Sequence, residues 1–187
     1  MKNKIVFIIV ILTLLFTSCG KNNYTIDDVL AWHERHSNDP YLDSLGYEQV
    51  APRDGYVMIS ANYEKLKLRF IVDKNSTVND FNYSRVIVDS DYMKDVKFPN
   101  NSIEFKKAEN RAKIVFSYYL HFEKIEFHNY DKPDTIFGNK KLYFFFGEKL
   151  TLVYSPNRAD KLINYFSKTP LKAKIIKIDN NWFLFSE

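Results

Sequence analysis

The 187-residue sequence contains one cysteine, Cys19, and only five glycines. Without a second cysteine, an internal disulfide bond is impossible. The formal net charge of +4 is too small to indicate a nucleic-acid-binding surface. The chain also has no G-x-S-x-G elbow and no glycine-rich phosphate loop. These absences leave no motif for nucleophilic catalysis or for a cofactor, and the sequence does not favour an enzyme.

An apolar run covers residues 5–16, after a start that carries Lys2 and Lys4. As a helix, this run would extend about 18 Å, against a bilayer hydrocarbon core of about 30 Å. The run is therefore too short to cross a membrane. A charged start, a short apolar run and small residues at a cleavage position are the layout of an export signal.

Thr17 and Ser18 directly precede Cys19, and the stretch FTSCG resembles the lipobox of bacterial lipoproteins, in the form found in Bacteroidota. The resemblance implies a signal peptide over residues 1–18, a diacylglyceryl thioether on Cys19 and an acylated new amino terminus, for example with palmitate. Two or three acyl chains anchor a protein stably. No acidic cluster follows Cys19 before Asp27, which in that phylum implies a tether facing the periplasm. We expect a lipid-anchored protein of the cell envelope, at the outer membrane, with the inner membrane as the alternative.

Removing residues 1–18 leaves 169 residues with 25 basic and 23 acidic side chains. This length is enough for one hydrophobic core. We expect residues 19–24 to form a lipidated tether and residues 25–187 to form a single α+β domain. Two tripeptides in this domain resemble the O-glycosylation motif of exported Bacteroidota proteins, with Ser44 and Thr135 as the acceptors.

The domain begins with a predicted helix, in which Thr25 caps the first turn and Asp28 takes the capping-box position. A second helix is predicted over residues 155–168, with Ser155 as its cap and Pro156 in its first turn. Alternating apolar residues predict strands, and residues 38–55 read as a loop with one helical turn near Tyr41. The predicted strands are 56–62, 66–73, 85–89, 142–154 as a hairpin, and 171–178 with 182–186 as a C-terminal hairpin.

The sequence therefore predicts an antiparallel sheet of six to eight strands, with an N-terminal helix and a second helix before the C-terminal hairpin. Residues 102–128 fit two patterns. β-Branched and aromatic residues favour a strand over 112–127. A helical stripe is the alternative, with its members at Phe105, Ala108, Ala112, Val115, Tyr119 and Phe122.

His33 and His36 are the candidate ligand or metal residues. The stretch WHERHS comes close to the zinc motif H-E-x-x-H, but Ser37 occupies the position of the second histidine. Two histidines three residues apart could share a metal if His121 or His128 approached them. Packing against the sheet explains them equally well, so no metal site is assigned.

The function that the sequence favours is a non-catalytic, membrane-anchored module that binds one protein partner, of the kind that gives immunity to an incoming toxin. Exposed aromatic residues would supply its interface, with Tyr118, Tyr119 and Trp182 as candidates. An accessory lipoprotein of an envelope assembly, transport or motility complex is one alternative. A ligand carrier or enzyme with an aromatic-lined pocket is the other. No nucleic-acid partner is expected.

Overall fold

The structure, a computed structural model, describes residues 23–46, 48–63, 66–88, 94–95, 102–129, 141–168 and 173–187. Cys19, the predicted signal peptide and Thr135 lie outside the described residues. In the part of the chain that is described, no helix is both long and apolar enough to span a bilayer.

A ten-stranded antiparallel sheet forms the centre of the fold, in the order β5-β4-β3-β2-β1-β6-β7-β8-β10-β9. The α+β class, the N-terminal helix and the helix before a C-terminal hairpin are confirmed. The sheet has two strands more than the upper end of the predicted six to eight. The elements, in chain order, are α2 (Ile26–His36), α3 (Tyr41–Ser44), β1 (Gln49–Arg53), β2 (Tyr56–Tyr63), β3 (Leu66–Asp73), β4 (Tyr83–Val88), β5 (Lys94–Asp95), α4 (Ile103–His121), β6 (Glu126–Asn129), β7 (Leu142–Phe146), β8 (Leu150–Tyr154), α5 (Ala159–Phe166), β9 (Lys174–Lys177) and β10 (Trp182–Ser186).

The capping box of α2 forms as predicted. The Asp28 backbone N–H donates to the Thr25 hydroxyl oxygen at 3.2 Å, and the Thr25 N–H donates to the Asp28 carboxylate at 2.8 Å. These bonds satisfy donors that the first turn of a helix otherwise leaves without partners. They also lower the pKa of the Asp28 carboxyl below its ordinary value, mainly through the backbone hydrogen bond.

The predicted strand over residues 112–127 is wrong, because most of this segment belongs to the 19-residue helix α4. The Ser102 hydroxyl caps the helix by accepting from the Phe105 N–H at 3.1 Å. The alternative helical stripe is the face that the sheet covers: Phe105, Ala108, Ala112, Val115, Tyr119 and Phe122 are all buried. Burial of this continuous face outweighs the strand propensity of the individual residues.

Strand β1 lies inside the segment predicted as a loop. It pairs with β2 along its whole length, around a tight turn in which Gly55 has a φ of +82°. Its pairing with β6 involves only Gln49 and Val50. The pairing of β1 with β6 therefore ends before Pro52, whose ring nitrogen has no hydrogen to donate to a neighbouring strand. The helical turn predicted near Tyr41 is present as α3.

Helix α5 begins later than predicted. Its N-cap is Arg158, and Pro156 lies in the preceding turn. The Ser155 N–H donates instead to the Asn181 carbonyl oxygen at 2.7 Å. Ser155 therefore ties this turn to the C-terminal hairpin and does not cap the helix.

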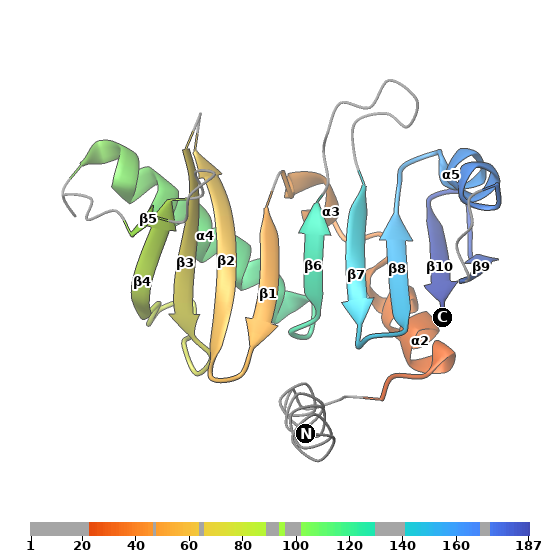
Figure 1. The fold of residues 1–187 in the computed structure, drawn as a ribbon, viewed down its shortest axis with the longest axis horizontal. Coiled ribbons are helices and arrows are strands. Elements are labelled where there is room, and N and C mark those ends of the chain that lie inside the picture. The colour runs from red at the N-terminus through yellow and green to blue at the C-terminus, as the bar shows by residue number, and fades with distance from the viewer. Residues whose placement is uncertain are drawn as a thin grey trace, which may run out of the picture.

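Two hydrophobic cores lie on opposite faces of the sheet. The larger core fills the space between the sheet and helices α2 and α4. Figure 1 shows α4 passing behind β1 to β4, and α2 behind β8. The smaller core lies under α5 and contains Val153, Ala159, Leu162 and Phe183. Because Val153 and Phe183 alternate with Leu152 and Leu184 of the larger core, α5 packs on the other face of the sheet.

Candidate functional site

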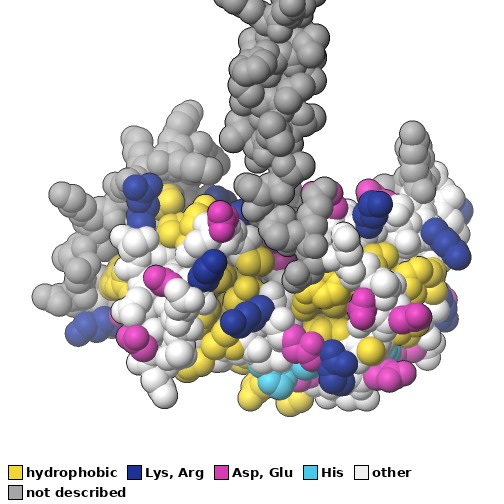
Figure 2. Space-filling view, turned by 90° about the horizontal axis from the view of Figure 1, so that it is seen from below, with side chains coloured by type: hydrophobic (Ala, Val, Ile, Leu, Met, Phe, Trp, Pro, Cys, Tyr) yellow, Lys and Arg dark blue, Asp and Glu magenta, His cyan; other side chains and the backbone are white. Residues whose placement is uncertain are grey.

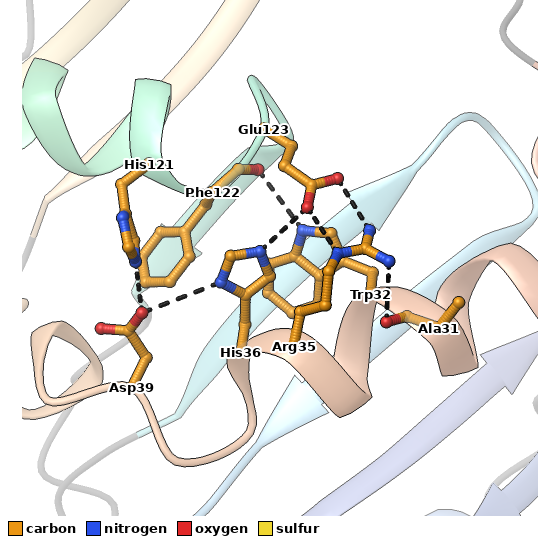
Figure 3. A network of polar contacts seen from close by, with 8 residues as sticks. All are labelled: Ala31, Trp32, Arg35, His36, Asp39, His121, Phe122 and Glu123. Atoms are coloured by element: carbon orange, nitrogen blue, oxygen red, sulfur yellow. Dashed lines mark hydrogen bonds and ion pairs between the residues drawn. The ribbon is translucent and has the colours of Figure 1, made fainter.

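A network of polar side chains lies where the last turn of α2 meets the end of α4 (Figure 3). Trp32 anchors α2 at this point: its side chain is 1% exposed, and its indole N–H donates to the Phe122 carbonyl oxygen at 3.4 Å. The Trp32 ring also packs on Phe144, with the ring centroids 4.7 Å apart. These contacts fix the end of α2 against the turn that follows α4.

That turn has a backbone conformation uncommon for its residues. Glu123 and Lys124 have φ angles of +58° and +62°, in the left-handed region that favours glycine. The Phe122 N–H donates to the Tyr118 carbonyl oxygen, and the Lys124 N–H donates to that of Tyr119, each at 2.8 Å. Backbone strain of this kind is frequent at functional sites. Here the turn directs the Glu123 side chain toward α2.

Arg35 binds Glu123 through two nearly parallel hydrogen bonds. Its Nε donates to Oε1 at 2.8 Å and its Nη2 donates to Oε2 at 2.9 Å. This bond to Arg35 is the main reason that the pKa of the Glu123 carboxyl lies below its ordinary value, and His36 adds to the effect. The carboxylate therefore stays charged at neutral pH.

His36 is the buried member of the network, with 7% of the residue exposed. Its Nε2 lies 3.1 Å from Oε1 of Glu123. A carboxylate only accepts hydrogen bonds, so Nε2 carries the proton and, in the neutral ring, Nδ1 carries the lone pair. Within the described residues, Nδ1 is buried and has no hydrogen-bond partner. It faces Oδ2 of Asp39 at 3.8 Å.

Asp39 joins His36 to His121. Its side chain is 9% exposed, its Oδ2 contacts Nε2 of His121, and its Oδ1 accepts the Tyr41 N–H at 2.9 Å. The donor atoms of His36, Asp39 and His121 all lie within 4.8 Å of one another. His121 is the solvent-facing member, with 40% of its side chain exposed. In the view from below, a histidine side chain reaches the surface beside acidic and basic side chains (Figure 2).

The structure separates the two histidines that the sequence paired. His33 lies 3.3 Å from a carboxylate oxygen of Asp179, in the turn before β10. Its ring meets Trp182 at a centroid distance of 5.2 Å. His128 lies on β6, 3.0 Å from Glu126. Of the candidate ligands, only His36 joins the network, and its histidine partner is His121.

Tyr118, Tyr119 and Trp182, the residues predicted for an interface, are 8%, 5% and 1% exposed. Their rings belong to the larger core, where Trp182 packs on Tyr154 at 4.8 Å. Burial raises the pKa of the Tyr119 hydroxyl to about 12. The predicted interface at these three residues is therefore corrected: they stabilise the fold and present no exposed ring.

A second polar network holds the segment between α3 and β1. Glu48 is 3% exposed, and its Oε1 accepts from Nε of Arg111 at 2.7 Å. Arg111 also donates to the Ser44 carbonyl oxygen at 2.9 Å, while the Gly46 N–H donates to Glu48. The network connects α4 to this segment and has a structural role. Ser44 itself is exposed, as its predicted glycosylation requires.

One face of the sheet carries no helix between β4 and β7 in the described part of the chain. We call this surface the open face. Cross-strand pairs place Met58 opposite Ile71, Arg69 opposite Ile87, and Glu126 opposite Phe145. The partly exposed members of the open face are Gln49, Met58, Arg69, Ile71, Ile87, Glu126, His128 and Phe145. Arg53 and Arg85 on the same face are exposed.

A half-open groove of about 480 Å³ runs along α2. Tyr24, Trp32, Arg35, Glu123 and Phe146 are among its lining residues. Tyr24 and Phe146 meet edge to face, with their ring centroids 5.4 Å apart. The groove therefore shares Arg35 and Glu123 with the polar network.

Sequence reasoning did not single out Asp39, Arg35 or Glu123. Asp39 lies three residues after His36, and this spacing was the one local signal for it. Glu123 is 87 residues from His36, and its approach depends on how α4 packs. No family model matches this chain, and neither a curated protein nor a solved structure matches it.

Proposed function

We propose that this protein is a lipid-anchored module of the cell envelope that binds one protein partner without catalysis and gives immunity to an incoming toxin. The open face is the observation that carries the proposal. It presents partly exposed apolar side chains between charged ones, which is the composition of a non-obligate protein interface. The occupant that we propose is a single secreted protein.

Charged side chains lie directly beside apolar ones on the open face. Phe145 contacts His128, with the ring centroids 4.8 Å apart, and the two supply an aromatic patch near the middle of the sheet. Arg53 lies 3.6 Å from Glu126, and Arg85 is exposed toward the β4 edge. A partner surface with an apolar centre and acidic groups at its rim would complement this arrangement.

The lipobox-like start supports the location in the proposal. Asn23 is four residues after Cys19. An extended chain spans at most about 3.5 Å per residue, so a lipid on Cys19 would hold Asn23 within about 14 Å of the membrane surface and Ile26, where α2 begins, within about 25 Å. We propose the outer membrane, with the domain in the periplasm.

Affinity capture of the full-length, C-terminally tagged protein from its own cells tests the proposal. Cells are grown alone and beside competitors, and captured proteins are identified by mass spectrometry. We expect one stoichiometric secreted partner that appears only with competitors. Phe145→Arg should abolish its capture, because the change puts a charge into the middle of the open face.

Ile103→Arg is the matched control, because Ile103 is a large apolar residue of α4 that is 68% exposed and lies away from the open face. This variant should retain the partner. Capture that Phe145→Arg leaves unchanged would refute the open face as the interface. A partner found in both cultures would indicate an accessory subunit of an envelope complex, and no partner in either culture would refute the binding module.

A further inference from the structure

We propose that His36, Asp39 and His121 bind a divalent transition-metal ion, with Zn²⁺ as the ion that their chemistry fits. Two imidazole nitrogens and one carboxylate oxygen are a donor set that zinc uses in proteins. Calcium and magnesium prefer sites built from oxygen alone. This inference does not depend on the proposed protein partner.

The three donors come from three segments that the fold brings together. His36 ends α2, Asp39 follows it before α3, and His121 ends α4. Their donor atoms lie within 4.8 Å of one another. Zinc ligands lie at about 2.0–2.2 Å from the ion, so a shared ion requires only small side-chain rotations. His121 can make such a rotation, because 40% of its side chain is exposed.

The buried nitrogen of His36 points to a ligand. Within the described residues, Nδ1 of His36 has no hydrogen-bond partner, although the atom is buried. Buried polar atoms almost always have a partner, so one that lacks it requires an explanation. Nδ1 faces Asp39, on the side of the ring where His121 also lies (Figure 3). A metal ion between the three side chains would accept its lone pair.

Glu123 and Arg35 complete the arrangement. Metal-binding histidines usually donate their second ring N–H to a carboxylate, which fixes the tautomer and strengthens the ligand. Nε2 of His36 lies 3.1 Å from Glu123, and Arg35 holds that carboxylate by two hydrogen bonds. The strained turn at Glu123 therefore supports the proposed site, because it places the Glu123 carboxylate beside Nε2 of His36, the ring nitrogen that would not bind the metal.

The site would remain open on one side. Tyr41 contacts the His121 ring edge to face at 4.9 Å, and 40% of Tyr41 is exposed. Zinc sites with three protein ligands keep a fourth position for water. We expect a four-coordinate ion that water can reach.

Metal titration of the full-length protein in detergent micelles, after treatment with a chelator, tests the site. Calorimetry with Zn²⁺ should give one ion per chain, and Co²⁺ should give the intense visible absorption of a four-coordinate complex. His121→Ala and Asp39→Asn should each lower the affinity at least about 10-fold, and Glu123→Gln should lower it about 10- to 100-fold. His33→Ala and His128→Ala are the controls and should leave the affinity unchanged.

Circular dichroism and thermal melting establish that each variant folds. Because His121 is exposed, His121→Ala should not disturb the buried core. Absence of stoichiometric binding to the folded wild-type protein would overturn the proposal and leave a network of ion pairs only. Binding that survives both His121→Ala and Asp39→Asn would overturn it as well, because the ion would then lie elsewhere.

Discussion

Replacing Arg111 with methionine tests how strongly a buried carboxylate stabilises the connection between α4 and the segment before β1. The Glu48 side chain is 4% exposed, and that of Arg111 is 28% exposed. Methionine retains an apolar stem that can pack on α4. It removes the donor to Glu48 at 2.7 Å and the donor to the Ser44 carbonyl oxygen at 2.9 Å.

The expected loss of stability follows from the burial of Glu48 and the partial exposure of Arg111. Removing one partner of a buried ion pair costs about 3–5 kcal/mol, because the other charge is left buried. Water can reach the space left by Arg111, and the Gly46 N–H still donates to Glu48. We therefore expect Arg111→Met to lower the free energy of unfolding by about 2–3 kcal/mol.

Urea unfolding of the wild type, Arg111→Met, Glu48→Gln and the double variant measures this loss and the coupling between the two residues. The double variant should lose less than the sum of the single variants, because it contains no unpaired buried charge. Lys113→Met is the control: its ion pair with Glu109 at 3.4 Å is more exposed, and its loss should stay within about 0.5 kcal/mol. Equal losses for Arg111→Met and Lys113→Met would refute the reasoning.

Three further changes have defined outcomes. Trp32→Ala should lower the free energy of unfolding by about 3–5 kcal/mol in urea, because it leaves a cavity among buried aromatic rings. Tyr119 has a pKa raised from 10.0 to about 12 by burial, so the unfolded chain loses this proton first. Stability should fall by about 1.4 kcal/mol per pH unit between these two values, and Tyr119→Phe should remove that part of the fall. Cys19→Ser should abolish labelling by a palmitate analogue and release the protein from the membrane fraction.

Each of these predictions has a contradicting result. A loss below about 1 kcal/mol for Trp32→Ala would mean that the core closes around the change. If wild type and Tyr119→Phe lose stability equally at alkaline pH, the loss comes from deprotonation of another residue. Tyr154 is an example, because burial raises its pKa as well. Palmitate labelling that survives Cys19→Ser would refute the lipid anchor on that residue.

Local signals predicted those elements whose pattern is complete within a few residues. The capping box of α2 needs only Thr25 and Asp28, and the hairpin of β7 and β8 needs only alternating apolar residues around a turn at Gly147. Strand β1 gave no such signal, because its five residues include Pro52 and follow a long irregular stretch. Its place in the sheet depends on pairing with β2 and β6.

Helix α4 shows where propensity fails. Its aromatic and β-branched residues favour a strand individually, yet their 3.6-residue spacing gives one continuous buried face. The candidate site was predictable only in part for a related reason. His36 could be singled out, but His121 and Glu123 reach it only after α4 is placed and the chain turns back at its end. Tertiary packing, which sequence spacing does not report, brings the site together.

The two ends of the sheet limit how a partner can bind. Unpaired strand edges invite strand addition by other chains, and short or charged edge strands prevent it. Here the outermost strands are β5, which has two residues, and β9, which has four residues and exposed lysines at both of its ends. Lys177 on β9 is further held by Asp160 of α5 at 2.7 Å. Such edges offer little backbone for strand addition, so the proposed partner would have to be recognised by side chains on the surface of the sheet and not by main-chain hydrogen bonds.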